Sequence, residues 1–264
     1  MINISELPAN LQYLLAGGTW QAISMGCSGN QVFHIARPNA PTCYLKIATS
    51  PSQQELVTAE KERLDWLQGR LPVPSIYAFC SDSAHTYLLT SEISGLMACD
   101  AAFAQDIPAV VHLLAEGLRH IHQVDITHCP FDQRLASEIA SIQQRVAAGL
   151  VDTANFDDQH QGMSTAELFR ILVASQPSTE DNVFTHGDYC LPNVLIDQPH
   201  SRINGFIDWG RSGISDRYQD LVAAARSLTR NFGPGWEPLL WEMYGLETLD
   251  TAKYQFYLLL DKFY

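Results

Sequence analysis

Short runs of alternating apolar and polar residues fill the first part of the chain and predict β-strands. Such runs occupy residues 20–47, 75–80 and 85–92, and glycine and proline residues mark the turns between them. Residues 53–68 differ, because their apolar positions recur every three or four residues and so indicate a helix. The stripe of this helix consists of Leu56, Ala59, Glu60, Arg63, Leu64 and Leu67. The pattern predicts an antiparallel sheet with one helix.

Beyond Gly95 the helical spacing dominates. One helix is expected from residue 107, a second over 135–149, and a third after the capping box formed by Ser164 and Glu167. Residues 150–163, between the second and third helices, are acidic and irregular. Further helices are expected at 216–229, 236–244 and 250–262, and strands return at 183–209.

The length of the chain suits two lobes, because 264 residues can bury a substantial core. Residues 1–92 form the expected strand-rich N-terminal lobe, and residues 93–264 form the expected, mainly helical, C-terminal lobe. The fold class predicted from these patterns is α+β.

A polar loop at 186–193 interrupts the strands of the C-terminal lobe. It carries Asp188 and Asn193, and a later apolar run ends on Asp208. The spacing of Asp188 and Asn193 matches the catalytic loop of kinases, where the aspartate accepts a hydroxyl proton and the asparagine holds a metal ion. Alone, Asp188 could stabilise a turn and Asp208 could cap a helix. Together, a base and two oxygen ligands for Mg²⁺ predict phosphoryl transfer.

A buried charge pair is expected in the N-terminal lobe. Lys46 lies in an apolar strand, and Glu60 lies on the apolar stripe of the following helix. A buried carboxylate needs a partner, and Lys46 is the nearest candidate on a strand. In kinases, such a lysine holds the nucleotide phosphates while the glutamate orients it. The alternative is that Glu60 pairs with Arg63, about one turn away on a partly exposed edge.

Other polar residues give weaker signals. The turn at 26–29, Gly-Cys-Ser-Gly, has backbone amides that could meet phosphate oxygens, but many hairpins share this composition. Histidines 120, 122, 128 and 186 lack the spacing of zinc ligands, and His186 is expected to fix the 186–193 loop by hydrogen bonding. Ser28 and Ser212 have no evident histidine or aspartate partners, which argues against a hydrolase.

Composition narrows the class of partner. A net charge of -13 argues against nucleic-acid binding and suits a cationic small molecule, although charge for solubility alone would look the same. No apolar run is long enough to span a membrane, and the N-terminus lacks the pattern of a signal peptide. The 6 cysteines are scattered, which is typical of reduced thiols. We therefore expect a cytoplasmic protein without membrane partners, either a monomer or a weak dimer.

Several motifs resemble one family, the aminoglycoside 3′-phosphotransferases, which are the kanamycin and neomycin kinases of antibiotic-resistant bacteria. The motifs are His-Gly-Asp-Tyr-Cys-Leu-Pro-Asn at 186–193, the segment from Phe206 to Asp220, Cys-Pro-Phe-Asp at 129–132, and shorter matches at 148–152, 160–162 and 166–169. The similarity covers nearly the whole chain and is closest to the type II neomycin phosphotransferase. It implies a two-lobe fold like that of protein kinases.

The resemblance also implies roles in catalysis and nucleotide binding. Asp188 would be the base that faces the 3′-hydroxyl of the drug, and Asn193 and Asp208 would hold Mg²⁺. Lys46, oriented by Glu60, would contact the phosphates of ATP, with GTP as the alternative nucleotide. The other nucleotide-binding positions would be the turn at Ser28, the ring of Tyr44 stacked on adenine, and the backbone of Ser91 and Ile93.

An acidic surface for the drug is implied as well. The substrate-binding positions would be Asp157, Asp158, Arg211, Arg226, Asp261 and the terminal carboxylate of Tyr264. The chain departs from the family at Lys262, where the family usually has glutamate, and at Ser227, Arg230 and Asn231, where it carries acids. Lys262 and Arg230 favour the alternative of a related kinase with a choline-like or homoserine-like hydroxyl acceptor. A third hypothesis, a catalytically inactive binding module, is disfavoured because the base and both metal ligands are present.

Overall fold

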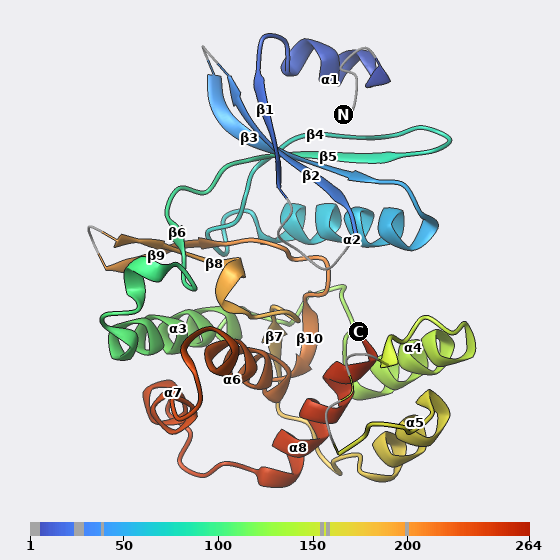
Figure 1. Ribbon diagram of the computed structural model, residues 1–264, viewed down its shortest axis with the longest axis vertical. Helices are drawn as coiled ribbons and strands as arrows, with labels where there is room; N and C mark the ends of the chain where they lie inside the picture. The colour runs from blue at the N-terminus through green and yellow to red at the C-terminus, as the bar shows by residue number, and fades with distance from the viewer. Residues whose placement is uncertain (1–5, 24–28, 38–39, 154–155, 157–158, 199–200) are drawn as a thin grey trace. The chain divides into compact units, whose positions relative to one another are not determined.

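Figure 1 shows the protein as a computed structural model, which describes residues 6–23, 29–37, 40–153, 156, 159–198 and 201–264. These residues form two compact units. The first consists of Met1–Leu96 with Leu195–Arg211, and the second of Met97–Val194 with Ser212–Tyr264. An α+β architecture, with an antiparallel sheet in one unit and most of the helices in the other, confirms the predicted fold class.

The first unit is built on a five-stranded antiparallel sheet of order β1-β2-β3-β5-β4. Its strands are β1 (Thr19–Ile23), β2 (Gln31–Arg37), β3 (Ala40–Ala48), β4 (Ile76–Ser81) and β5 (Thr86–Ser91). Alternate residues of β3 point to opposite faces. Cys43, Leu45 and Ile47 enter an apolar core. Tyr44 and Lys46 therefore lie together on the other face.

A short helix that the sequence patterns did not indicate completes this core. Helix α1 (Ala9–Leu14) contributes Leu11, and Leu15 follows directly after it. Both side chains are fully buried among the residues of β2 and β3. With 6 residues, the helix is too short to show a clear apolar period.

Helix α2 (Pro51–Leu67) begins two residues before the expected start at 53, because Ser50 and Gln53 form a capping box and Pro51 suits the first turn. Its buried residues are Val57, Glu60, Arg63, Leu64 and Leu67. The expected stripe was wrong at Leu56, which is 42% exposed. Residues 57, 60, 64 and 67 recur at helical spacing and take the buried face instead.

A smaller sheet of order β6-β8-β9 consists of β6 (Leu96–Met97), β8 (Val194–Asp197) and β9 (Arg202–Phe206). The backbone N–H of Phe206 donates to the Pro72 carbonyl at 3.0 Å, and the Asn204 amide donates to the Ser94 carbonyl at 2.7 Å. These contacts hold residues 195–211 in the first unit, although the range 93–264 assigned them to the second lobe. The division into functional lobes stays a prediction.

The second unit is mainly helical, as predicted. Its helices are α3 (Ile107–His122), α4 (Leu135–Ala147), α5 (Thr165–Ala174), α6 (Tyr218–Phe232), α7 (Glu237–Tyr244) and α8 (Thr251–Leu260), with the short 3₁₀ turns η2 (Ala101–Phe103), η4 (Leu191–Asn193) and η6 (Asp261–Phe263). The predicted capping box of Ser164 and Glu167 is present at the start of α5. Leu172, Val222 and Phe256 belong to one apolar core beneath these helices.

Two strands of the second unit were predicted incompletely. Strand β7 (Asn182–Thr185) pairs with β10 (Gly213–Asp216), antiparallel, in a two-stranded sheet. The sequence patterns gave no strand at 213–216. The apolar runs on either side of the 186–193 loop thus belong to different sheets, β7 with β10 and β8 with β6 and β9. The loop belongs to the second unit, and the chain enters the first unit at Leu195.

Candidate active site

The predicted pair of Lys46 and Glu60 is present in the first unit. Lys46 is on β3 and Glu60 on α2, and Lys46 Nζ donates to both carboxylate oxygens, at 2.7 Å and 2.8 Å. The side chain of Glu60 is only 10% exposed, so its charge needs this partner. Arg63, the alternative partner, donates instead to the Ala59 carbonyl at 3.2 Å.

Asp208 joins this pair in the same unit. Its Oδ1 accepts a hydrogen bond from Lys46 Nζ. Burial lowers the pKa of Lys46, but the Asp208 and Glu60 carboxylates more than offset this, so the pKa is raised. Lys46 therefore stays a cation through the physiological range. A cation held between two acids can exchange one of them for a phosphate oxygen.

The backbone at Asp208 is unusual. Its φ of 65° lies in the left-handed region, which aspartate tolerates better than most residues, at a cost of about 1 kcal/mol or more. The turn is held in place by Trp209, whose indole N–H donates to the Phe206 carbonyl at 3.0 Å, and by Gly210, where a Cβ would lie 3.3 Å from the Leu56 carbonyl oxygen. The turn thus presents a carboxylate that is 46% exposed.

In the second unit, Asp188 follows β7 and is oriented by Asn193. The Asn193 amide nitrogen donates to the Asp188 carbonyl at 3.0 Å and to Asp188 Oδ2 at 3.2 Å. Asn193 lies on the turn η4 and is 5% exposed. Because its nitrogen faces Asp188, the amide oxygen is the atom that would serve as a metal ligand. The two residues that the spacing singled out are therefore in contact.

His186 holds the same loop, as predicted. It is fully buried, and its Nδ1 accepts the backbone N–H of Asp188 at 3.3 Å. Tyr189, also fully buried, donates its hydroxyl proton to the Leu114 carbonyl on α3 at 2.9 Å. Both side chains tie the loop to the interior of the second unit and leave Asp188 less buried than its neighbours.

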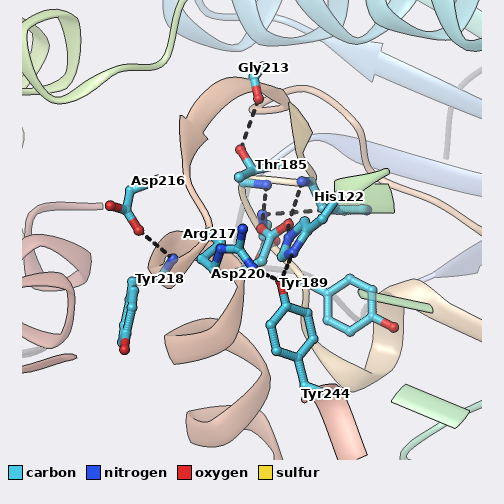
Figure 2. Close-up of polar contacts among 12 residues, drawn as sticks. His122, Thr185, Tyr189, Gly213, Asp216, Arg217, Tyr218, Asp220 and Tyr244 are labelled. Carbon is cyan, nitrogen blue, oxygen red and sulfur yellow. Dashed lines mark hydrogen bonds and ion pairs between the residues drawn. The ribbon is translucent and has the colours of Figure 1, made fainter. Parts of the chain in front are cut away.

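The main anchor of this loop is Asp220 on α6, a residue that was not among the predicted site residues. Its carboxylate is fully buried and accepts the backbone N–H groups of His186 at 2.7 Å and Gly187 at 2.8 Å. Figure 2 shows that His122 contacts the same carboxylate, and the distance from its Nε2 is 3.1 Å. The signal that identified Glu60 also applied to Asp220, which is an acid next to Leu221 on the buried side of a helix.

Ser227 also supports the loop. It lies on the buried side of α6, is 7% exposed, and accepts the backbone N–H of Leu191 at 2.9 Å. The resemblance had marked position 227 as one where an acid of the family stands near the drug. Here the serine hydroxyl stabilises the backbone beside η4 instead.

The other nucleotide-binding candidates lie in the first unit. Tyr44 pairs with His34 on β2 and Thr90 on β5, and its ring lies 4.9 Å from that of His34. The N–H of Ser91 donates to the Ser75 carbonyl at 2.8 Å, so only the Ser91 carbonyl could contact a purine. Ile93 packs against Gly205, where a Cβ would lie 2.7 Å from its side chain. Ser28 is outside the described residues.

Some of the residues predicted to bind the substrate lie within the described ranges. Asp261 pairs with Arg226. The hydroxyl of Tyr264 donates to Glu138, and its ring lies 5.2 Å from the guanidinium of Arg145. Arg211 ends the first unit's segment 195–211 and is partly buried, while Asp157 and Asp158 lie outside the described residues.

Three further expectations concern metals, thiols and membranes. Within the described ranges, no three or more histidine, cysteine or acidic side chains are grouped to hold a metal ion. The described cysteines that are free thiols are Cys43, Cys80, Cys99, Cys129 and Cys190, and of these only Cys43 is fully buried, while Cys27 lies outside the described residues. Of the helices that the structure describes, none has the length and apolar character to cross a membrane.

The sequence and the fold are similar to those of known proteins. Residues 19–257 match the model of the phosphotransferase enzyme family. An aminoglycoside 3′-phosphotransferase of Niallia circulans is 37% identical over 97% of this chain and 97% of its own. The crystal structure of an aminoglycoside 3′-phosphotransferase of type VIII superposes with a TM-score of 0.86, at 30% identity, over 97% of both chains.

A third similar protein was solved with ligands. It is the aminoglycoside phosphotransferase APH(3″)-Id of Streptomyces rimosus, in complex with ADP and streptomycin. It superposes with a TM-score of 0.78, at 27% identity, over 100% of this chain and 99% of its own. The fold described here is therefore one that holds a nucleotide in a similar protein.

Proposed function

This chain belongs to the phosphotransferase enzyme family, among its aminoglycoside 3′-phosphotransferases, and from that premise we propose that it transfers the γ-phosphoryl group of ATP to the 3′-hydroxyl of an aminoglycoside antibiotic. Such a transfer protects a bacterium from the drug. The observation that carries the proposal is the contact of Asn193 with Asp188 on a loop anchored by Asp220. These contacts give the Asp188 carboxylate a defined orientation on a loop that the buried Asp220 supports.

Asp188 is the base of the proposed reaction. Its carboxylate accepts the proton of the acceptor hydroxyl as the hydroxyl oxygen bonds to the γ-phosphorus, while the bond from this phosphorus to the bridging oxygen breaks and ADP leaves. Phosphoryl transfer depends on position and charge more than on covalent chemistry, so the loop must hold Asp188 in place. His186, Asn193 and Asp220 perform this task through the hydrogen bonds described above.

Lys46 is the phosphate-binding residue of the proposed reaction. Glu60 holds its ammonium group from the helix side, and the contact with Asp208 keeps it charged. Tyr44 lies on the same face of β3, and its ring would stack on the purine of the nucleotide. The Ser91 carbonyl and the backbone of Ile93 would form hydrogen bonds with the same purine. The ADP complex of the Streptomyces rimosus protein supports an adenine nucleotide as the donor, with GTP as the alternative.

Mg²⁺ is the metal proposed for the reaction. The Asn193 amide oxygen, in the second unit, and the Asp208 carboxylate, in the first, would each offer an oxygen donor of the kind that Mg²⁺ prefers. The orientation of the Asn193 nitrogen toward Asp188 and the partial exposure of Asp208 both fit this use. When bound, the ion neutralises charge on the phosphate oxygens. With Asp208 bound to the ion, the ammonium group of Lys46 would be available to bind the phosphates.

The proposed acceptor is a polycation, which suits a protein of net charge -13. The proposed contacts for its ammonium groups are Asp157, Asp158, Asp261 and the carboxylate of Tyr264, and Arg211 and Arg226 are the other substrate-binding residues that we propose. Arg226 pairs with Asp261, so a drug ammonium that binds Asp261 competes with this guanidinium. We further propose that the enzyme acts in the cytoplasm, where ATP is available, as a monomer or weak dimer without nucleic-acid or membrane partners.

The choline-like or homoserine-like acceptor is not favoured. Its main support was the positive charge of Lys262, but this side chain is buried, with 9% exposed. Arg230 is exposed and lies in the last turn of α6, where a cation stabilises the helix end. Neither Lys262 nor Arg230 is therefore a reason to replace the aminoglycoside with another acceptor.

The test combines turnover with the position of the new phosphate. Purified protein, Mg-ATP and kanamycin should release ADP, and ³¹P–¹H NMR should place the phosphate on the 3′-oxygen. A kanamycin derivative that lacks only the 3′-hydroxyl is the matched control and should give no turnover. A phosphate found on another hydroxyl, or ADP release only with choline or homoserine, would overturn the assignment.

A further inference from the structure

A chain of polar side chains extends behind the 186–193 loop to α7. Figure 2 shows Arg217, Tyr244, His122 and Asp220 in contact. Arg217 donates to the Tyr244 hydroxyl oxygen at 3.1 Å, and this hydroxyl lies 2.8 Å from His122 Nδ1. His122 Nε2 lies 3.1 Å from Asp220 Oδ2. At the outer end, Arg217 Nε forms an ion pair with Asp181 Oδ2 at 2.7 Å.

The chemistry of these groups gives a direction to the hydrogen bonds once His122 is taken as a neutral imidazole. An arginine can only donate, so the Tyr244 oxygen accepts from Arg217. The Asp220 carboxylate accepts hydrogen bonds from two backbone N–H groups, and it also accepts one from the N–H at His122 Nε2. The Tyr244 hydroxyl then donates a hydrogen bond to His122 Nδ1. We therefore assign His122 as the neutral tautomer with its proton on Nε2.

Burial makes this assignment consequential. The side chains of His122 and Asp220 are 4% and 0% exposed, and Tyr244 is 7% exposed. Burial raises the pKa of Tyr244, with a partial opposing effect of Arg217, so the phenol keeps its proton. If His122 took the other tautomer, its Nε2 lone pair would face the Asp220 carboxylate in a site with little water. Two acceptors in contact repel, and a buried polar group without a partner is costly.

We propose that Tyr244 is a positioning residue for the transfer reaction. Its hydroxyl holds His122 in the Nε2-protonated tautomer, and His122 in turn orients the Asp220 carboxylate that sets the backbone at His186 and Gly187. Asp188 is the next residue along the chain. The inference rests on the proposed role of Asp188 as the base. Tyr244 lies 56 residues beyond Asp188 in the sequence, and it would act on the reaction only through His122 and Asp220.

The variant Tyr244→Phe tests this proposal, because it removes the hydroxyl and keeps the ring. In protein with ¹⁵N-labelled histidine, the His122 ring signals, assigned by their loss in His122→Gln, should move from the Nε2-protonated pattern toward a mixture of tautomers. The kcat for kanamycin should fall about tenfold, the rate equivalent of one buried hydrogen bond. The KM for ATP should stay within about twofold, because Lys46 and its partners are unchanged.

The matched control is Tyr218→Phe. Tyr218 is also buried in the second unit, and its hydroxyl accepts the backbone N–H of Asp250 at 2.7 Å, outside the chain that leads to the loop. This variant should lose similar stability in urea but keep the wild-type His122 tautomer and kcat. A tautomer unchanged in Tyr244→Phe would overturn the proposal, as would an equal loss of kcat in both variants.

Arg217→Gln provides a second route if Tyr244→Phe does not fold. Arg217 is partly exposed and its loss leaves the Tyr244 ring in place. The His122 signals should shift in the same direction and kcat should fall by a smaller factor, and wild-type values for both would overturn the proposal. The NMR measurement needs no substrate. If the wild-type protein turned over no aminoglycoside, the proposed function would fail while the tautomer assignment was still decided by the spectra.

Discussion

The carboxylate of Asp220 accepts the backbone N–H of Gly187 at 2.8 Å, one residue before the proposed base Asp188. Gly187 has a φ of 80°, a conformation that glycine adopts without strain. With this backbone conformation, the N–H groups of His186 and Gly187 point into the interior and both donate to the buried Asp220 carboxylate. The position of Asp188 is therefore set from behind, by a residue on α6.

We expect Asp220→Asn to disturb this arrangement more than a change of one atom suggests. An amide can accept through only one of its two polar atoms, so its nitrogen would face N–H donors from His186, Gly187 or His122. The loss should be about 1–3 kcal/mol of stability, with a fall in kcat. Urea denaturation and steady-state kinetics would measure both. Wild-type stability together with wild-type kcat would show that the carboxylate is not the anchor.

Substitution of the proposed base gives a sharper kinetic prediction. Asp188→Asn keeps the size of the side chain but removes the proton acceptor, so kcat should fall about 10²–10⁴-fold. Nucleotide binding should persist, because Lys46 and Glu60 are untouched. ADP release measured with kanamycin, and ADP affinity measured by calorimetry, would separate the two effects. A variant with near-normal kcat would exclude Asp188 as the base.

The pair of Lys46 and Glu60 should behave as one unit toward ATP. Lys46→Met and Glu60→Gln should each raise the KM for ATP, because either change loses the ammonium group or its orientation. The double variant should be less impaired than the sum of the two, with a coupling energy of about 1–3 kcal/mol. A double-mutant cycle on ATP affinity measures it. Strict additivity would mean that the pair serves the fold and not the nucleotide.

The capping box of α5 predicts a response to acid. Hydrogen bonds from the Ser164 hydroxyl and backbone N–H lower the pKa of Glu167 below its ordinary value. A lowered pKa means that the carboxylate stabilises the fold above the ordinary pKa and loses this effect as pH falls through the folded-state pKa. Glu167→Gln can still accept these hydrogen bonds but does not titrate. Its urea midpoint should therefore decline less than that of wild type between pH 5 and 3, and parallel declines would contradict this.

Local sequence was enough for most elements and for half of the site. Helical and strand periods identified nearly all elements, with errors where a helix was short, as in α1, or where the buried stripe was displaced, as at Leu56. The loop at 186–193 could be identified because its chemistry depends on residues close together in sequence. Lys46 and Glu60 could be paired because a buried carboxylate on a helix needs a cation, and one strand nearby carried it.

Tertiary structure alone decided which distant polar groups meet. No local pattern could show that β7 pairs with β10, that residues 195–211 pack in the first unit, or that Asp220 and Tyr244 support a loop far from them in sequence. A periodic pattern shows which face of an element is buried, but the partner of a buried polar group depends on how the elements pack against one another. Local sequence patterns thus identify the proposed reacting residues, and the packing of the folded protein determines how these residues are oriented.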